Sequence, residues 1–173
     1  MSSHIAFVTS TPRLDALAAT VVLDNRRPFP VEEGARLDQY AHSTGLDEIK
    51  KEIIRMGLKI KAKVQGLEVE LPVTKPMALL HMSGRLTTGE SEIAIIKILM
   101  SSEKISGKTL KTWHIGDINP QVTNLNSDLI IIYPNVRYEI PEDVPFCPLF
   151  SQVSLGAQTV SHSRISSTIS GSI

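Results

Sequence analysis

An alternation of apolar and charged residues between positions 58 and 71 constrains the fold more than any other feature of this sequence. Lysines alternate with apolar side chains over residues 58–64, glutamates do the same over residues 67–71, and Gly66 separates the two runs. Because successive side chains of a β-strand point to opposite faces, the pattern predicts two strands, each with one apolar and one solvated face.

Two apolar segments follow the alternating region. Residues 77–82 are strong helix formers that lie between Pro76 and Gly84, which predicts a helix. Residues 93–100 follow a helical period and are apolar nearly all round, which is typical of a buried helix. Their isoleucine content would also suit a strand, but the acidic start at Glu90 and Glu92 favours a helix.

Further elements are expected on both sides of this region. A helix is predicted over residues 47–56, because acidic residues begin the segment, basic residues end it and Gly57 follows. Apolar spacing indicates another helix over residues 12–23, although residues 21–23 could equally begin a strand. Residues 105–126 are interpreted as a long loop. Apolar or alternating runs predict strands at residues 128–133, 136–140 and 152–155, with Pro145 and Pro148 interrupting the chain before the last.

A chain of 173 residues is expected to form one domain. The predicted fold class is α+β, with a small antiparallel β-sheet packed with two or three helices and an extended N-terminal arm. Residues 1–46 are assigned to the arm and linker, residues 47–160 to the globular domain, and residues 161–173 to a serine-rich tail.

Positive and negative charges balance at 18 each, but the cations gather between positions 50 and 63. A basic group of this kind attracts phosphates or anionic lipid heads over about a Debye length. A solvated face is the plainer interpretation, and Glu48 and Glu52 oppose the cations locally. The candidate binding residues are Lys50, Lys51, Arg55, Lys59, Lys61 and Lys63.

The single tryptophan, Trp113, lies within the expected loop. Packing in the core is the plainer interpretation of this residue. A position at a membrane interface or a protein contact is the sharper one, and it adds Trp113 to the candidate binding residues.

Residues 26–30 combine two arginines, two prolines and a phenylalanine, and they suit an extended segment that docks into an apolar groove. A plain linker is the alternative. The clustered acidic residues that could receive the arginines lie near position 140. The candidate self-association residues are therefore Arg26, Arg27, Pro28, Phe29, Pro30, Glu139, Glu142 and Asp143.

Motifs of catalysis and of metal or nucleotide binding are absent from the sequence. No phosphate-binding glycine loop, zinc-ligand spacing or nucleophile elbow occurs, and the five histidines are scattered singly. Cys147 is expected to be a small buried hydrophobe rather than a nucleophile. We therefore expect no enzymatic activity, no cofactor and no metal site. Since no apolar run approaches the ~20 residues that span a bilayer, any membrane association is expected to be peripheral.

The middle of the chain resembles the matrix proteins of rhabdoviruses, especially the plant-infecting, cytorhabdovirus-like branch. The resemblance is carried by the lysine-bearing run at residues 59–64, residues 77–82, the string at residues 96–102, and residues 138–141 and 152–160. The chain lacks the proline-tyrosine budding motif and the lysine-rich N-terminal arm of animal-virus members. Budding through that motif and strong membrane binding through such an arm are therefore not expected.

The resemblance implies a viral matrix protein, a structural protein of the virion. Such a protein self-associates, binds and condenses the helical nucleocapsid, and links it to the inner leaflet of the envelope during assembly and budding. The implied partners are further copies of the chain, the nucleocapsid protein–RNA complex, the anionic inner leaflet and the viral glycoprotein tail. The implied location is beneath the virion envelope, and in the cytoplasm and at the membranes of the host. A small non-enzymatic accessory or cytosolic adaptor protein is the alternative, and a hydrolase using Cys147 or a histidine is a third class.

Overall fold

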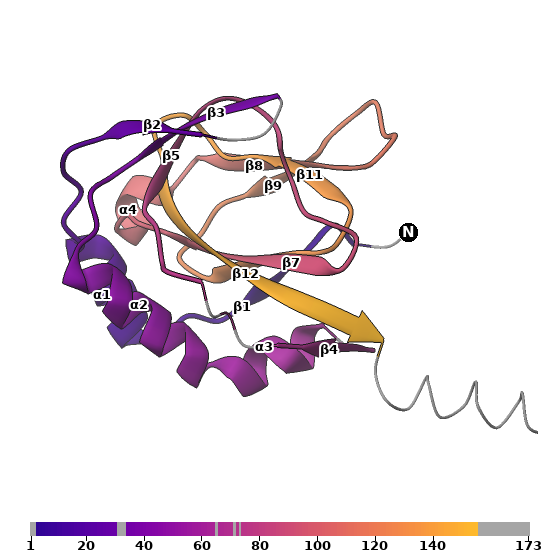
Figure 1. Ribbon diagram of the computed structural model, residues 1–173, viewed down its shortest axis with the longest axis horizontal. Helices are drawn as coiled ribbons and strands as arrows, with labels where there is room; N and C mark the ends of the chain where they lie inside the picture. Colours follow the sequence, from indigo (N-terminus) through magenta and orange to yellow (C-terminus); the bar gives the residue numbers. More distant parts are fainter. Residues whose placement is uncertain (1–2, 31–33, 65, 71, 73, 156–173) are drawn as a thin grey trace, which may run out of the picture.

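The computed structural model describes residues 3–30, 34–64, 66–70, 72 and 74–155, and they form three layers (Figure 1). Helices cover one face of a large sheet, and a smaller sheet covers the other face. These helices are α1 (Pro12–Thr20), α2 (Thr44–Arg55) and α3 (Gly57–Lys63), whereas the short α4 (Ser102–Ile105) buries Ile105 in the core between the two sheets. The α+β class is confirmed, but the strands form two sheets rather than one small sheet.

Antiparallel pairing joins the strands of both sheets. The eight-stranded sheet has the order β1 (Ile5–Val8), β10 (Leu129–Ile132), β7 (Glu92–Ile98), β12 (Pro145–Leu155), β5 (Leu79–Gly84), β3 (Ala35–Gln39) and β2 (Arg27–Phe29), with β4 (Leu67–Val69) paired to β12. The four-stranded sheet has the order β6 (Leu86–Thr87), β11 (Val136–Glu139), β8 (Thr109–His114) and β9 (Gln121–Asn124).

The segment at residues 93–100 is wrongly predicted as a helix, since most of it forms β7. Ile93 and Ile95 pack under the helices, whereas Ile96 and Ile98 pack between the two sheets. A central strand covered on both faces carries apolar side chains on both of them, and this pattern imitates a helix that is apolar nearly all round. The isoleucine content was the correct signal.

The helix predicted over residues 77–82 is also wrong, because residues 79–82 belong to β5. Its backbone pairs with β3 on one side and with the start of β12 on the other. Those two neighbours satisfy its N–H and C=O groups, and this tertiary pairing outweighs a local helix propensity of a few tenths of a kcal/mol per residue.

The strand predicted over residues 58–64 is wrong in the opposite sense, since α3 covers this segment. Met56, Ile60 and Val64 are buried in the core beneath the helices and recur every four residues. They continue the buried stripe of Ile49 and Ile53 on α2 past Gly57. One buried residue per turn satisfies the alternating pattern and the helical one equally, and the neighbouring core selects the helix.

The N-terminal arm predicted over residues 1–46 is wrong for the described residues. β1 is hydrogen-bonded along β10, and Leu14 and Ala18 of α1 are buried in the core beneath the helices. Arg27–Phe29 form β2, which pairs with β3. This part of the chain therefore belongs to the same domain as the rest.

The loop predicted over residues 105–126 contains two strands, β8 and β9, which pair with each other. The prolines near position 145 do not interrupt β12 either. Backbone bonds at Pro145 and Val153 direct the odd-numbered residues of β12 toward β7, so Pro148 faces the opposite edge. No strand pairs with that edge between residues 147 and 152 of the described chain, so the missing N–H of Pro148 removes no bond.

Several predicted elements are confirmed. α1 and α2 lie where helices were expected, and Thr11 caps α1 by accepting a hydrogen bond from the Leu14 amide at 3.1 Å. β10, β11 and β4 occupy predicted strands, and residues 152–155 form the end of β12. The tail at residues 161–173 lies outside the described residues.

Candidate functional site

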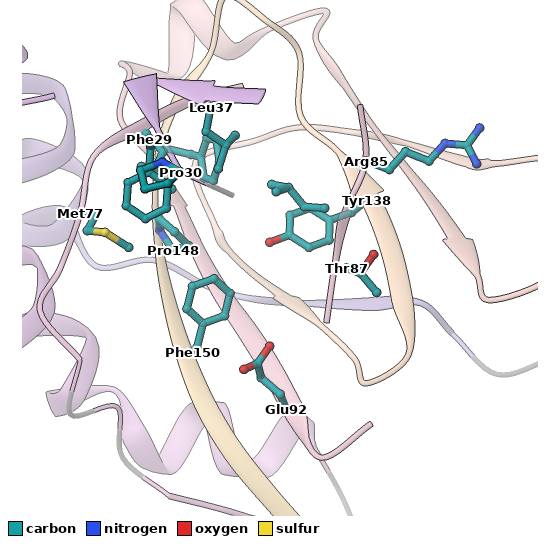
Figure 2. A pocket seen from close by; sticks show the side chains of 13 residues that line it. Phe29, Pro30, Leu37, Met77, Arg85, Thr87, Glu92, Tyr138, Pro148 and Phe150 are labelled. Carbon is teal, nitrogen blue, oxygen red and sulfur yellow. The ribbon is translucent and has the colours of Figure 1, made fainter. Parts of the chain in front are cut away.

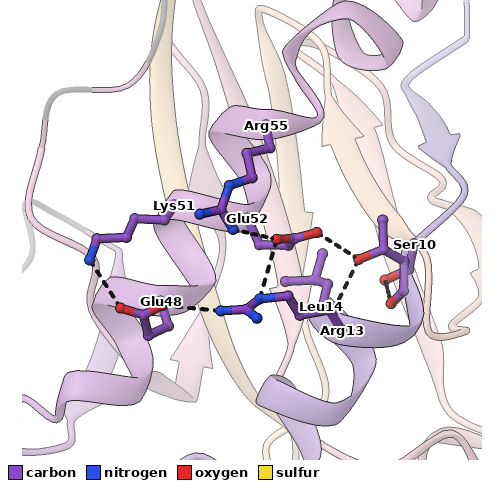
Figure 3. Close-up of polar contacts among 8 residues, drawn as sticks. Ser10, Arg13, Leu14, Glu48, Lys51, Glu52 and Arg55 are labelled. Carbon is purple, nitrogen blue, oxygen red and sulfur yellow. Dashed lines mark hydrogen bonds and ion pairs between the residues drawn. The ribbon is translucent and has the colours of Figure 1, made fainter.

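Half of the predicted basic group is engaged within the fold, and Figure 3 shows the ion pairs of Lys51 and Arg55. Lys51 forms an ion pair with Glu48 at 3.0 Å, and Arg55 forms one with Glu52 at 3.0 Å. Arg13 of α1 reaches both carboxylates, at 3.3 Å and 3.5 Å. The Nζ atom of Lys50 donates to the carbonyl of Thr74 at 2.7 Å. Arg13 therefore links α1 to the carboxylates of α2, the cations Lys51 and Arg55 are paired within α2 itself, and Lys50 anchors the loop at Thr74.

The lysines of α3 differ from those of α2. Lys59, Lys61 and Lys63 are exposed, and none of them forms an ion pair within the described part of the chain. Leu58 lies beside them with 85 % of its surface exposed. This helix therefore presents an apolar side chain and three free cations on one exposed element.

Local contacts also use part of the predicted self-association set. Arg26 lies 3.9 Å from Asp38 of the neighbouring strand, and Asp143 forms an ion pair with Lys108. Phe29 packs against the core between the sheets, so its ring has a place to bury within its own chain. The exposed members of the set are Arg26, Arg27, Pro28, Pro30, Glu142 and Asp143, and Glu139 is half-buried.

Trp113 is not exposed, and its assignment to a membrane or partner contact is wrong. Its side chain is 3 % exposed, and the guanidinium of Arg85 lies over the ring at 3.9 Å from the centroid. The arrangement is a cation–π contact that covers the indole. Packing, the plainer interpretation, is correct for this residue.

Cys147 and His4, two of the groups considered for nucleophilic chemistry, are buried in the fold. Burial raises the pKa of the Cys147 thiol to about 12, which keeps it protonated at neutral pH. The Nδ1 atom of His4 shares a 2.8 Å hydrogen bond with the hydroxyl of Thr112. The rings of His4 and His114 meet in an edge-to-face contact. Burial and the neighbouring His114 lower the pKa of His4. No group of three or more metal-binding side chains occurs among the described residues, and none of their helices is long and apolar enough to cross a bilayer.

A cavity of about 800 Å³ lies between the two sheets, beside the edge strand β6 (Figure 2). Aromatic side chains dominate its walls: Phe29 from β2, Phe146 and Phe150 from β12, and Tyr138 from β11. Glu92, at the start of β7, brings a carboxylate to the same space. The cavity is thus mainly apolar with a few polar groups, as small-molecule sites usually are.

Two polar groups of the cavity have unsatisfied capacity. Tyr138 is only 2 % exposed, and its hydroxyl points into the cavity without a hydrogen-bond partner among the described residues. Burial, together with the nearby charge of Glu92, raises the pKa of Tyr138 and keeps the phenol protonated. The Glu92 carboxylate accepts one long bond, at 3.4 Å from the Gly89 amide, and forms no ion pair within the described part of the chain.

Sequence reasoning missed both the cavity and the exposed leucine. Leu58 could have been found, because the four-residue spacing of Met56, Ile60 and Val64 places it off the buried stripe. The cavity residues carry no shared local signal. Phe29, Glu92 and Tyr138 are far apart in sequence and meet only because β2, β7 and β11 are brought together by the two sheets.

The comparisons with known proteins leave the function open. No family model matches this sequence, and no curated relative matches it. Among solved structures, a prolyl-4-hydroxylase from Pseudomonas putida is similar with a TM-score of 0.47 and 11 % identity, over 90 % of this chain and 95 % of that one. A likeness at this level carries no argument about fold or activity here.

Proposed function

We propose that this chain is a non-enzymatic assembly protein of the matrix type. It would bind an anionic membrane surface peripherally, associate with further copies of itself, and hold a helical nucleocapsid beneath the envelope. The observation that carries the membrane part is α3, on which Leu58 is exposed beside three lysines that lack ion pairs within the described chain. An apolar side chain that enters the interface, with cations that meet anionic heads, is the usual combination for peripheral binding.

The contact at α3 is small, so its strength must come from repetition. Each lysine near an anionic surface is worth up to about 1 kcal/mol, and a single exposed leucine adds roughly 1–2 kcal/mol. One molecule would therefore bind weakly. An array of molecules that present α3 on the same side would bind strongly, because linked contacts act as one multivalent ligand.

Flotation with vesicles that contain phosphatidylserine tests this proposal. Reversal of Lys59, Lys61 and Lys63 to glutamate should abolish flotation at low salt, and Leu58→Ser should weaken it severalfold. The matched control reverses Lys75, Lys104 and Lys111, which are also exposed but do not lie on α3. Equal loss of flotation in both triple variants would show that net charge, and not α3, causes the binding. Unchanged flotation of the α3 variant would overturn the membrane role.

Self-association is tested separately by light scattering against protein concentration. The candidates at the sheet edge are Arg27 and Pro28, which remain exposed on β2, the last strand of the eight-stranded sheet. Arg27→Glu should lower the scattering of any assembly that uses this edge, and Lys104→Glu serves as its control. A protein that stays monomeric at every concentration would favour the adaptor alternative over a matrix protein.

A further inference from the structure

The cavity between the two sheets combines an aromatic wall with an unpaired negative charge. Phe29, Phe146, Phe150 and Tyr138 line a space of about 800 Å³, and the Glu92 carboxylate borders the same space. In Figure 2 the Tyr138 hydroxyl and the Phe150 ring face each other, with Glu92 beside Phe150. Contact between these aromatic side chains and water is unfavourable, so the cavity favours a ligand with an apolar body.

The two polar groups specify the kind of occupant. A buried hydroxyl and a half-buried carboxylate, both with free capacity, are each satisfied by a hydrogen-bond donor. A positively charged donor is attracted most strongly, because Glu92 supplies the opposite charge and aromatic faces attract cations. A ligand with an anionic group would instead place like charges side by side.

The positive charge of Arg85, which also borders the cavity, does not oppose a cationic ligand. Arg85 borders the cavity, but its guanidinium lies over the Trp113 ring and is directed away from Phe150 and Glu92 in Figure 2. The positive charge of Arg85 is therefore directed to the outer side of the small sheet. The negative charge of Glu92 is the one that faces the aromatic wall.

We propose that this cavity binds a small organic cation, with an apolar body against the aromatic wall and an ammonium group between Glu92 and the Tyr138 hydroxyl. This site is separate from the membrane contact at α3 and does not depend on it.

Calorimetric titration of the full chain with three probes tests the proposal. Phenylbutylamine, phenylbutanol and phenylbutyrate share one apolar body and differ only in the charge of the end group. The amine should bind roughly tenfold more tightly than the alcohol, because hydrogen bonds to charged groups are the stronger ones. The butyrate should bind most weakly. Equal binding of all three, tighter binding of the butyrate, or no binding of the amine would overturn the proposal.

Two variants assign the preference to named groups. Glu92→Gln should abolish the preference for the amine and leave the affinity of the alcohol within about twofold, since the shape is kept. Glu90→Gln removes an exposed carboxylate nearby and should change neither affinity. Tyr138→Phe should weaken the amine and the alcohol severalfold alike. An amine preference that persists in Glu92→Gln would assign the cation to another site.

The outcomes separate this site from the proposed function. Binding of the amine with unchanged vesicle flotation in Glu92→Gln is the expected result. Failure of flotation in the wild-type chain would leave the cavity proposal standing, and failure of amine binding would leave the role of α3 standing.

Discussion

The Nζ atom of Lys97, near the end of β7, lies 2.7 Å from the Oδ1 atom of Asp15 on α1. The lysine side chain is 1 % exposed, and it also donates to the hydroxyl of Ser10 at 3.2 Å and to the carbonyl of Ser127. The ammonium group is thus satisfied by three oxygens, each from a different segment. This ion pair, between a buried lysine and a partly exposed aspartate, fastens the first helix to a central strand of the large sheet.

Removal of the Asp15 charge should destabilise the protein more than removal of the Lys97 charge. Asp15→Asn leaves the Lys97 ammonium buried without its counter-charge and should cost about 3 kcal/mol of unfolding free energy. Lys97→Met removes the charge, keeps most of the volume, and should cost less. Urea unfolding monitored by circular dichroism measures both. A larger loss in Lys97→Met would mean that the bonds to Ser10 and Ser127 matter more than the charge.

The stability contributed by Lys97 should increase with pH in the alkaline range. Burial lowers the pKa of Lys97 from 10.5, and Asp15 only partly offsets this effect. Between the lowered pKa and the ordinary one, the unfolded chain binds more protons than the folded chain, so the unfolding free energy rises with pH. The difference in unfolding free energy between the wild type and Lys97→Met should therefore shift in favour of the wild type as pH rises toward 10.5. A difference that stays level or moves the other way contradicts this assignment.

A buried and an exposed apolar residue should respond differently to the same change. Ile96 is fully buried between the two sheets, so Ile96→Asp should cost more than about 4 kcal/mol or prevent folding, because an unpaired carboxylate would be buried. Leu58→Asp, on the exposed side of α3, should change stability by less than about 1 kcal/mol. Thermal melts of the two variants give the comparison. A mild effect of Ile96→Asp would show that β7 is not the centre of the core.

Deletion of residues 1–31 should prevent the chain from folding. The deletion removes β1 from the edge of the large sheet, Leu14 and Ala18 from the core, and Asp15 from Lys97. The exposed edge of β10 and the uncovered apolar surface should make the product insoluble or unfolded. Solubility and circular dichroism of the truncated chain test this prediction. A chain that ends at residue 155 is the comparison, because it keeps all of β12. A soluble, cooperatively melting product would restore the interpretation of this segment as an arm.

Local signals in the sequence were sufficient for part of the fold. The charges and the glycine at the ends of α2 located that helix, and the apolar spacing over residues 12–23 indicated α1. The unbroken apolar run of β10 predicted a strand that is buried on both faces. In each case one interpretation of the pattern was physically better than the others, so no knowledge of neighbouring segments was needed.

For the candidate site the sequence located the lysines but not their state. It could not separate Lys51 and Arg55, which are paired with Glu48 and Glu52, from Lys59, because all lie within one basic run. Ion pairing depends on where helices place side chains, and on the approach of Arg13 from α1. The cavity could not be predicted from the sequence for the same reason, because it depends on how distant segments pack together.

By itself, the sequence determined the α+β class, the two long helices and the strands whose pattern had a single interpretation. Tertiary structure decided the segments whose patterns fit two periods: residues 57–63 became a helix because Ile60 continues the stripe of α2, and residues 92–98 became a strand because both faces are covered. It also decided the meeting of Glu92 and Tyr138 across two sheets. The apolar content of a segment indicates how much of its surface is buried. Only the neighbouring layers of the fold decide whether one face or both faces are covered.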